Sequence, residues 1–166
     1  MSLDLKNSLL RQITEHLDGE LMALRTVAAA AHDAATHAEN RPENKYDTRG
    51  LEASYLAGAQ EARASQLQAT SELIKSITPR PFLNEDAVGL TALVKLSTED
   101  VATWYFILQV AGGYTLHSDH DSLIGTIMSI TPQTPLGRAI IGKRVGDEIT
   151  LRTNKGEKHY ELSQLL

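Results

Sequence analysis

An apolar stripe of helical period in the first quarter of the chain restricts the fold more than any other feature of the sequence. Its members recur at steps of three and four residues and are Leu10, Ile13, Leu17, Leu21, Leu24, Ala28, Ala31, Ala35 and Ala38. A helix from Leu5 to Ala38 would be about 50 Å long, at ~1.5 Å per residue. Such a helix is too long to fold back on a small domain, so we expect a second long helix to cover the stripe.

A second stripe follows and supplies the expected partner. Its members are Leu51, Tyr55, Gly58, Ala62, Gln66, Ala69 and Leu73, and it is widened by Leu56, Leu67, Ile74 and Ile77. Pro79 and Pro81 prevent the helix from continuing, so it ends near Ile77. We expect residues 1–78 to form an antiparallel helical hairpin, a coiled coil, that narrows towards its bend as alanine replaces leucine and isoleucine.

The second half of the chain carries the signals of β-strands. Leu90–Leu96 and Thr103–Val110 are rich in β-branched or aromatic residues, and Ile149–Leu162 contains two strand segments around a turn at Asn154–Gly156. Thr134 and Pro135 are typical of a helix start, and Gly142 of its end. We expect residues 79–166 to form a small α+β domain with a mostly antiparallel sheet and one short helix.

Composition excludes several classes of function. The chain has 166 residues, with 16 Lys and Arg against 21 Asp and Glu, a formal net charge of −5, 5% aromatic residues and no cysteine. A chain that binds DNA or RNA directly needs a basic face and, for single strands, aromatic platforms. We therefore expect no independent DNA binding, no disulfides and no thiolate chemistry. With no apolar run long enough to span a bilayer, we expect a cytoplasmic protein without a membrane segment.

Other candidate sites are weaker. His117, Asp119, His120 and Asp121 include potential metal ligands, but they lie in a polar, glycine-containing segment, so a solvated loop within Ala111–Thr126 is the favoured interpretation. The sequence contains no phosphate-binding loop, dinucleotide fingerprint or serine nucleophile elbow.

The run from Ile130 to Leu162 resembles the C-terminal signature of the bacterial Gre transcript-elongation factors, GreA and GreB. The matching elements are Thr-Pro-Leu-Gly-Arg-Ala at Thr134–Ala139, Gly142-Lys143 after an apolar pair, and Val-Gly-Asp-Glu at Val145–Glu148, before the terminal hairpin. The resemblance implies an N-terminal antiparallel coiled coil joined to an FKBP-like C-terminal domain, in agreement with the two halves described above.

The resemblance also implies a function. Gre factors bind RNA polymerase through the globular domain and insert the coiled coil into the secondary channel, where the polymerase active site cleaves backtracked RNA. The segment expected to contact the polymerase comprises Thr134, Pro135, Leu136, Gly137 and Arg138. The chain would then not be an enzyme itself and would have no cofactor of its own. It would share Mg²⁺ with the polymerase and approach the 3′ end of the backtracked RNA.

The tip of the hairpin departs from the family pattern. That pattern is an Asp, two residues, then Glu and Asn, and here Glu43 and Asn44 match while Asn40 replaces the Asp, with Glu39 just before it. The resemblance implies that Glu43 assists catalysis and binds the shared Mg²⁺, with Asn40 or Glu39 as second ligand. Asn40 and Glu43 also have the spacing of a capping box, a purely structural role.

Two alternatives to a cleavage factor therefore stay open. Asn40 brings no charge to a magnesium site, which favours a Gre-like regulator that binds the polymerase without promoting cleavage. An FKBP-like domain also raises prolyl isomerase activity. That alternative is less favoured, because four of the six aromatic residues of this half fall on strand segments, where core packing explains them.

Overall fold

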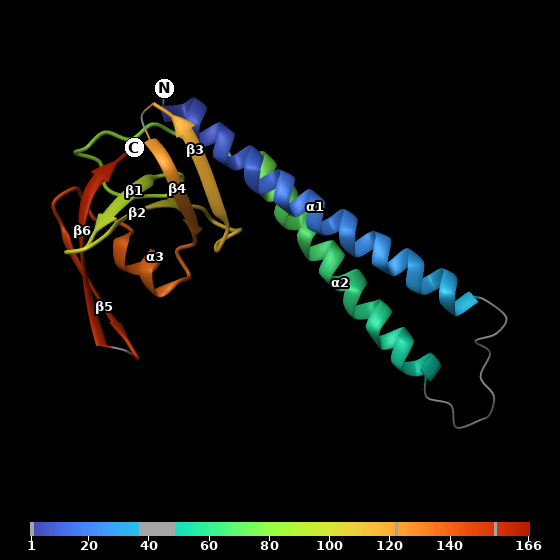
Figure 1. Ribbon diagram of the computed structural model, residues 1–166. Coiled ribbons are helices and arrows are strands. Elements are labelled where there is room, and N and C mark those ends of the chain that lie inside the picture. Colours follow the sequence, from blue (N-terminus) through green and yellow to red (C-terminus); the bar gives the residue numbers. More distant parts are fainter. Residues whose placement is uncertain (1, 37–48, 122, 155) are drawn as a thin grey trace. The chain divides into compact units, whose positions relative to one another are not determined.

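The computed structural model describes residues 2–36, 49–121, 123–154 and 156–166 (Figure 1). Its elements, in chain order, are α1 (Ser2–Thr36), α2 (Arg49–Ser76), β1 (Leu93–Ser97), β2 (Ala102–Ile107), β3 (Thr115–His120), β4 (Leu123–Ile130), α3 (Pro135–Ile140), β5 (Glu148–Thr153) and β6 (Gly156–Leu165). The chain divides into two compact units. One is Thr14–Leu73, and the other combines Met1–Ile13 with Ile74–Leu166.

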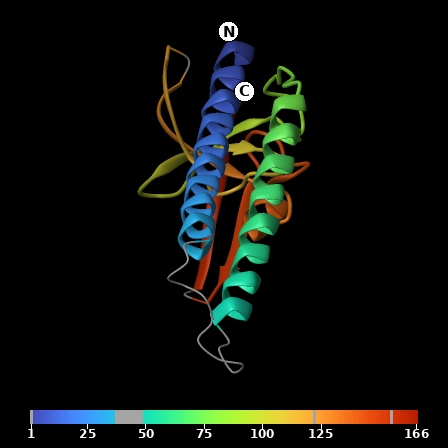
Figure 2. The ribbon, with the colours of Figure 1, turned by 90° about the vertical axis from the view of Figure 1, so that its right-hand side faces the viewer.

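The first unit is the expected antiparallel helical hairpin, in which α1 and α2 run side by side (Figures 1 and 2). The stripe of α1 faces inward as predicted: Leu17 is 2% exposed, and Leu21, Leu24 and Ala28 are half-buried. Burial thus decreases along α1 as its side chains become smaller. The α1 prediction from Leu5 to Ala38 matches the observed helix, which ends at Thr36 among the described residues.

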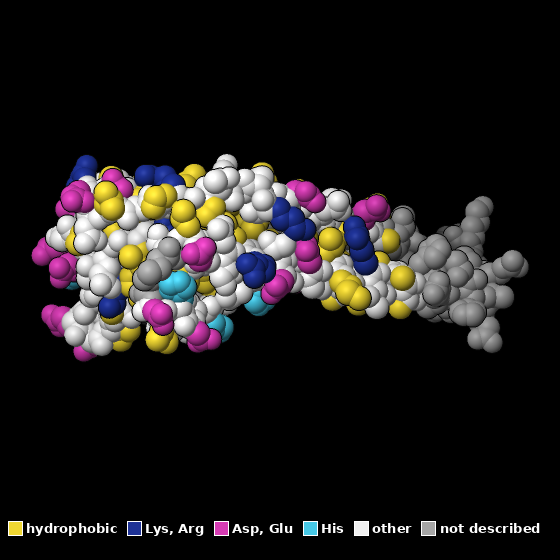
Figure 3. Space-filling view, turned by 90° about the horizontal axis from the view of Figure 1, so that it is seen from above, with side chains coloured by type: hydrophobic (Ala, Val, Ile, Leu, Met, Phe, Trp, Pro, Cys, Tyr) yellow, Lys and Arg dark blue, Asp and Glu magenta, His cyan; other side chains and the backbone are white. Residues whose placement is uncertain are grey.

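Polar contacts also join the two helices. The Ser71 hydroxyl donates to Asp18 Oδ1 at 2.8 Å, and Arg25 Nη2 donates to Gln68 Oε1 at 3.2 Å. On the face seen in Figure 3, acidic and basic side chains are intermixed along the described part of the hairpin, and neither sign gathers into a patch. The described part of that face therefore lacks the basic surface of a nucleic-acid binder.

The prediction of which face of α2 is buried was wrong. Tyr55 is 73% exposed and Leu73 is 49% exposed, whereas the buried positions from Tyr55 to Ser76 are Leu67, Ser71 and Ile74. Leu67 and Ile74 belonged to the residues that only widened the predicted stripe. Alanine-rich helices carry several overlapping stripes of similar strength, and only the position of the partner helix selects among them.

The second unit contains a six-stranded sheet in the order β3-β4-β2-β1-β6-β5. Four of its five pairings are antiparallel, as expected, and β2 with β4 is parallel, with Trp104 opposite Ile127. The short helix begins after Thr134 as predicted, and β5 and β6 form the predicted hairpin, although Lys155 in its turn lies outside the described residues.

The main core of this unit lies between the sheet and α3. Alternate side chains of adjacent strands point to this side, because strand side chains alternate between the two faces. The buried members are Phe82, Val88, Ala92, Val94, Leu96, Ile107, Ile130, Ile140, Ile149, Leu162 and Leu165. This core fixes α3, and with it the segment that resembles the Gre signature.

The first turns of α1 also belong to the sheet unit. Leu5 and Leu9 are at most 2% exposed. The Gln12 side-chain amide exchanges two hydrogen bonds with the backbone of His117: its Nε2 donates to the carbonyl at 2.7 Å, and its Oε1 accepts from the N–H at 3.0 Å. Gln12 thereby occupies backbone groups on the outer edge of β3, which would otherwise stay unpaired.

The prediction of a loop at Ala111–Thr126 was wrong. Most of it forms β3 and the start of β4, which pair in antiparallel register with His117 opposite Thr126. Leu116 and Ser118 are buried while His117 and Asp119 are exposed, so the segment alternates as a strand does. Its charged residues have low strand propensity, but at a sheet edge they are tolerated and discourage pairing with other chains.

Candidate functional site

The expected tip residues Glu39, Asn40 and Glu43 lie outside the described residues, which end at Thr36 in α1 and resume at Arg49 in α2. Their roles stay predictions. Among the residues that are described, no group of three or more histidines and carboxylates could hold a metal ion, and the His117–Asp121 segment forms no such site.

The segment Thr134–Arg138 is described in full and forms the start of α3. Thr134 has an extended conformation, with φ −72° and ψ 153°, and Pro135 occupies the first turn. The Thr134 hydroxyl accepts a hydrogen bond from Gly137 N at 3.0 Å and donates one to Thr131 O at 2.8 Å. Thr134 therefore caps the helix and ties it to the loop that follows β4.

Gly137 allows the close approach of this loop. A Cβ atom at Gly137 would lie 2.0 Å from Thr131 O and 2.9 Å from Thr134 Oγ1. Gly137 is buried, and Leu136 is half-buried and packs against the core. These two residues serve the internal packing of the segment.

Pro135 and Arg138 are the residues of this segment that face outward, and both are exposed. Arg138 Nε and Nη2 donate to Gln133 O at 3.2 and 2.8 Å. This two-point contact holds the guanidinium over the loop. The segment thus presents a rigid proline and a positioned cation.

A cluster of two cationic side chains around an aromatic ring lies in the same unit, and the sequence did not reveal it. Lys6 is fully buried, its Nζ donates to Arg80 O at 2.7 Å, and it lies 4.7 Å from the centre of the Phe82 ring. The Arg80 guanidinium lies 3.8 Å from the same ring centre. Burial, and then the nearby charge of Arg80, lower the pKa of Lys6 from 10.5 to about 8.

This cluster fastens the start of α1 to the segment that follows α2. The Thr91 hydroxyl also accepts a hydrogen bond from Arg80 N at 3.2 Å, so both backbone polar groups of Arg80 are used. A lysine between leucines at the start of a helix ordinarily indicates a solvated position, so no sequence signal identified Lys6 as buried.

The chain combines a helical hairpin with a small unit that has a mixed sheet, and the capped helix α3 of that unit carries the signature segment. This is the α+β fold that the resemblance to the Gre factors implies. None of the described helices is long and apolar enough to cross a membrane. Residues 113–165 match the family model described as "Transcription elongation factor, GreA/GreB, C-term".

Curated relatives extend this match over most of the chain. GreA of Chlorobaculum parvum is 30% identical over 132 residues, which cover 78% of this chain and 74% of that protein. The chain therefore belongs to the GreA/GreB transcription elongation factor family. GreA of Chlorobium phaeovibrioides is also 30% identical, over 63% of this chain and 61% of that protein, so in that comparison less than two thirds of the relative is spanned.

Relatives with a different name match with a similar sequence identity. The transcription inhibitor protein Gfh1 of Thermus aquaticus is 31% identical over 122 residues, covering 70% of this chain and 69% of that protein. A crystal structure of Gfh1 from Thermus thermophilus aligns over 92% of this chain and 94% of that chain at 22% identity, with a TM-score of 0.36.

Proposed function

We propose that this chain binds RNA polymerase in the cytoplasm, inserts its helical hairpin into the secondary channel and promotes cleavage of backtracked RNA by the polymerase active site. The observation that carries the proposal is membership of the GreA/GreB transcription elongation factor family over most of the chain. The catalytic centre belongs to the polymerase, so the chain is a factor that acts on an enzyme.

The sheet unit docks on the polymerase through Thr134–Arg138. Pro135 and Arg138 are exposed, and the cap of Thr134 fixes the backbone from which they project. A guanidinium has five N–H donors, and Gln133 O takes one from Nε and one from Nη2. The remaining donors are available to a carboxylate or carbonyl of the partner, and because the side chain is already held, little conformational entropy is lost on binding.

Docking is tested with Arg138→Ala in a polymerase-binding assay, with Arg11→Ala as control. Both arginines are exposed, and Arg11 lies on α1, away from the signature segment in the sequence. We expect Arg138→Ala to weaken binding about tenfold, equivalent to about 1.4 kcal/mol, and Arg11→Ala to leave binding unchanged. Equal affinities for the two variants would exclude Arg138 from the interface.

At the tip, Glu43 holds the Mg²⁺ ion that the polymerase supplies, with Asn40 or Glu39 beside it. Mg²⁺ in such sites is bound by one or two carboxylates and keeps several waters, and it stabilises the attacking and leaving oxygens of phosphoryl hydrolysis. One glutamate brought into the secondary channel can therefore complete a metal site of the polymerase.

The alternative is a polymerase-binding regulator that does not promote cleavage. Two observations favour it: Asn40 stands where the family pattern has a carboxylate, and a transcription inhibitor protein is among the relatives of about 30% identity. The neutral amide would bind Mg²⁺ more weakly than a carboxylate, and the factor would then occupy the channel without supplying the second charge.

A stalled, backtracked transcription complex distinguishes the two functions. With Mg²⁺ present, a cleavage factor releases short 3′ RNA fragments, and Glu43→Ala abolishes them while Glu61→Ala, on the exposed side of α2, does not. Binding to the complex without fragments would instead establish the regulator. If Asn40→Asp then produced fragments, the missing charge would be the cause.

A further inference from the structure

A groove of about 580 Å³ opens in the sheet unit where β1 ends and its neighbour β6 continues without it. One wall is the turn between β1 and β2, Thr98–Val101, and the other is the part of β6 from Lys158 to Tyr160. Leu96, Thr103 and Tyr105 line the groove between these walls. None of these residues belongs to the Thr134–Arg138 segment or to the hairpin, so the proposed function leaves the groove unused.

The groove coincides with an open position in the sheet. The pairing of β1 with β6 ends at Ser97 and Glu161, although β6 extends back to Gly156. Leu162 bonds through its N–H to Asp147 O, on the side of β5. Because backbone direction alternates along a strand, the N–H and C=O groups of Glu157 and His159 point to the opposite side, where β1 has ended. An extended chain placed there would find hydrogen-bonding partners.

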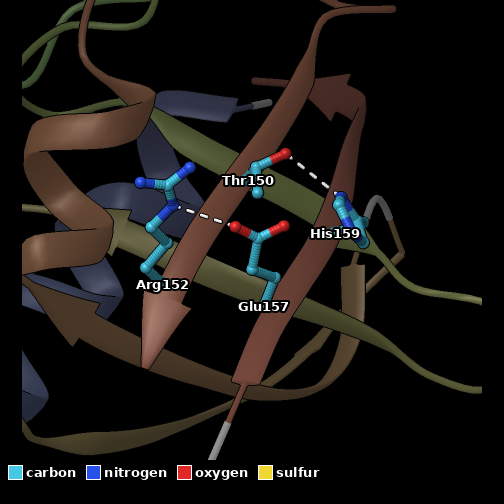
Figure 4. A network of polar contacts seen from close by, with 4 residues as sticks. All are labelled: Thr150, Arg152, Glu157 and His159. Carbon is cyan, nitrogen blue, oxygen red and sulfur yellow. Dashed lines mark hydrogen bonds and ion pairs between the residues drawn. The ribbon is translucent and has the colours of Figure 1, made fainter. Parts of the chain in front are cut away.

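The ribbon that forms this edge is held without help from β1. Figure 4 shows two contacts between β5 and β6 on the ribbon: Thr150 Oγ1 with His159 Nδ1 at 3.1 Å, and Arg152 Nε with Glu157 Oε1 at 2.9 Å. Directly opposed pairs of this kind stabilise an antiparallel ribbon. The edge is therefore already in strand conformation, and a binding chain need not order it.

The walls indicate what the binding chain carries. Glu99 and Asp100 are exposed on the turn, and the turn is fixed because Thr98 Oγ1 and the backbone of Val101 exchange two hydrogen bonds. Tyr105 and Tyr160 are half-buried in the groove and pack against the core. The groove lining thus carries two carboxylates against one ammonium group, that of Lys158, together with two aromatic rings. This lining suits a cationic side chain better than an anionic one, since a cation gains from both the carboxylates and the ring faces.

The two tyrosines lie close enough to influence each other. Burial, and then the proximity of Tyr160, raise the pKa of Tyr105, while a hydrogen bond with the Thr103 side chain acts in the opposite direction. The Tyr105 phenol, with its raised pKa, therefore stays neutral at physiological pH, and its hydroxyl can accept a hydrogen bond from a guanidinium or ammonium group.

We propose that an extended segment of a partner protein adds to β6 as a strand beside Glu157 and His159, with a lysine or arginine side chain lying between the Glu99–Asp100 turn and the two tyrosines. Strand addition of this kind takes its affinity from backbone hydrogen bonds and its specificity from alternate side-chain pockets. The proposal does not depend on polymerase binding and concerns a different surface of the chain.

The test is an NMR titration of the ¹⁵N-labelled full chain with acetylated, amidated hexapeptides. The probe alternates threonine and valine around one arginine, and a matched peptide has glutamate in place of arginine. We expect saturable shifts at the amides of residues 96–105 and 157–160, with at least tenfold weaker binding of the glutamate peptide. No shifts at millimolar peptide, or equal binding of both peptides, would overturn the proposal.

Backbone pairing is tested separately with N-methylated peptides. Alternate amides of an added strand face β6, so methylation of one alternate set should abolish binding while methylation of the other set is tolerated. Equal effects of the two sets would exclude strand addition.

The role of the acidic turn is tested in the chain itself. The double variant Glu99→Gln, Asp100→Asn should bind the arginine peptide about tenfold more weakly, whereas the control Glu85→Gln, Asp121→Asn, exposed elsewhere, should bind it normally. Equal losses in both variants would reduce the effect to net charge and contradict the site.

Discussion

Gly137→Ala is the sharpest test of how the signature segment is built. The new methyl carbon would lie 2.0 Å from Thr131 O, 2.8 Å from Thr131 C and 2.9 Å from Thr134 Oγ1. The two nearest atoms belong to backbone, so no side chain can rotate away to make room. The loop after β4 and the first turn of α3 would have to separate until the contact approached the ~3.5 Å of ordinary packing.

The cost follows from the contacts that this separation breaks. Inserting a methyl group into a packed site costs about 1–3 kcal/mol. Loss of the Thr134 cap, which bonds both Gly137 N and Thr131 O, costs about 1 kcal/mol more. Alanine returns about 1 kcal/mol through its higher helix propensity. We expect a net loss of about 1–3 kcal/mol, a sizeable part of the 5–15 kcal/mol that stabilises a typical domain.

The measurement uses the single tryptophan of the chain. Trp104 lies in β2, so its fluorescence during urea denaturation reports on the sheet unit, while far-ultraviolet circular dichroism also reports on the hairpin. Gly58→Ala is the matched control, because a Cβ at this exposed helical position meets nothing within 4 Å. It should stabilise α2 by about 0.5–1 kcal/mol and leave the Trp104 transition in place.

The same pair of variants links packing to docking. Gly137→Ala should weaken polymerase binding, since Pro135 and Arg138 project from the displaced turn, and Gly58→Ala should not. An unchanged Trp104 midpoint in Gly137→Ala would refute the reasoning, because it would mean that the loop yields at no cost.

Three further outcomes are expected. The folded-state pKa of Lys6, about 8, lies below the ordinary lysine value of 10.5, so the unfolded chain binds more protons between these values. The free energy of unfolding should therefore rise with pH across this window, by up to about 3 kcal/mol. Lys6→Met should lack that rise in urea titrations at pH 7.5 to 10.5. Leu9→Ala, at a fully buried position, should cost about 2–5 kcal/mol by the Trp104 transition, and Leu3→Ala, 38% exposed, clearly less; equal losses would contradict the burial of the first turns of α1. Ser71→Ala, which removes the bond to Asp18, should lower hairpin stability by about 1 kcal/mol in circular dichroism, and no change would show that water replaces the bond.

Local signals predicted much of this fold. The helical period alone predicts the stripe of α1, and Thr134 with Pro135 predicts the start of α3. The turn sequence predicts the last hairpin. In each case the residues that determine the structure are adjacent in sequence. The docking role of Thr134–Arg138 comes from the resemblance to the Gre signature and stays a prediction.

Features that depend on distant residues were missed or misplaced. The parallel pairing of β2 with β4 and the buried face of α2 depend on which segments meet in space. Lys6 is buried only because Arg80 and Phe82, more than 70 residues away, supply an acceptor and a ring. The strand at Thr115–His120 was obscured by charged residues that an edge position tolerates.

The division of the chain into units determines when the protein can fold. The sheet unit combines Met1–Ile13 with Ile74–Leu166, so the hairpin is an insertion within it. Its last strand, β6, pairs with both β1 and β5. During synthesis, the first turns of α1 emerge from the ribosome early but gain their contacts with Arg80, Phe82 and β3 only after the hairpin has been made. The hairpin can form first and reduce the length of flexible chain that separates the two parts of the unit, which lowers the entropic cost of bringing them together.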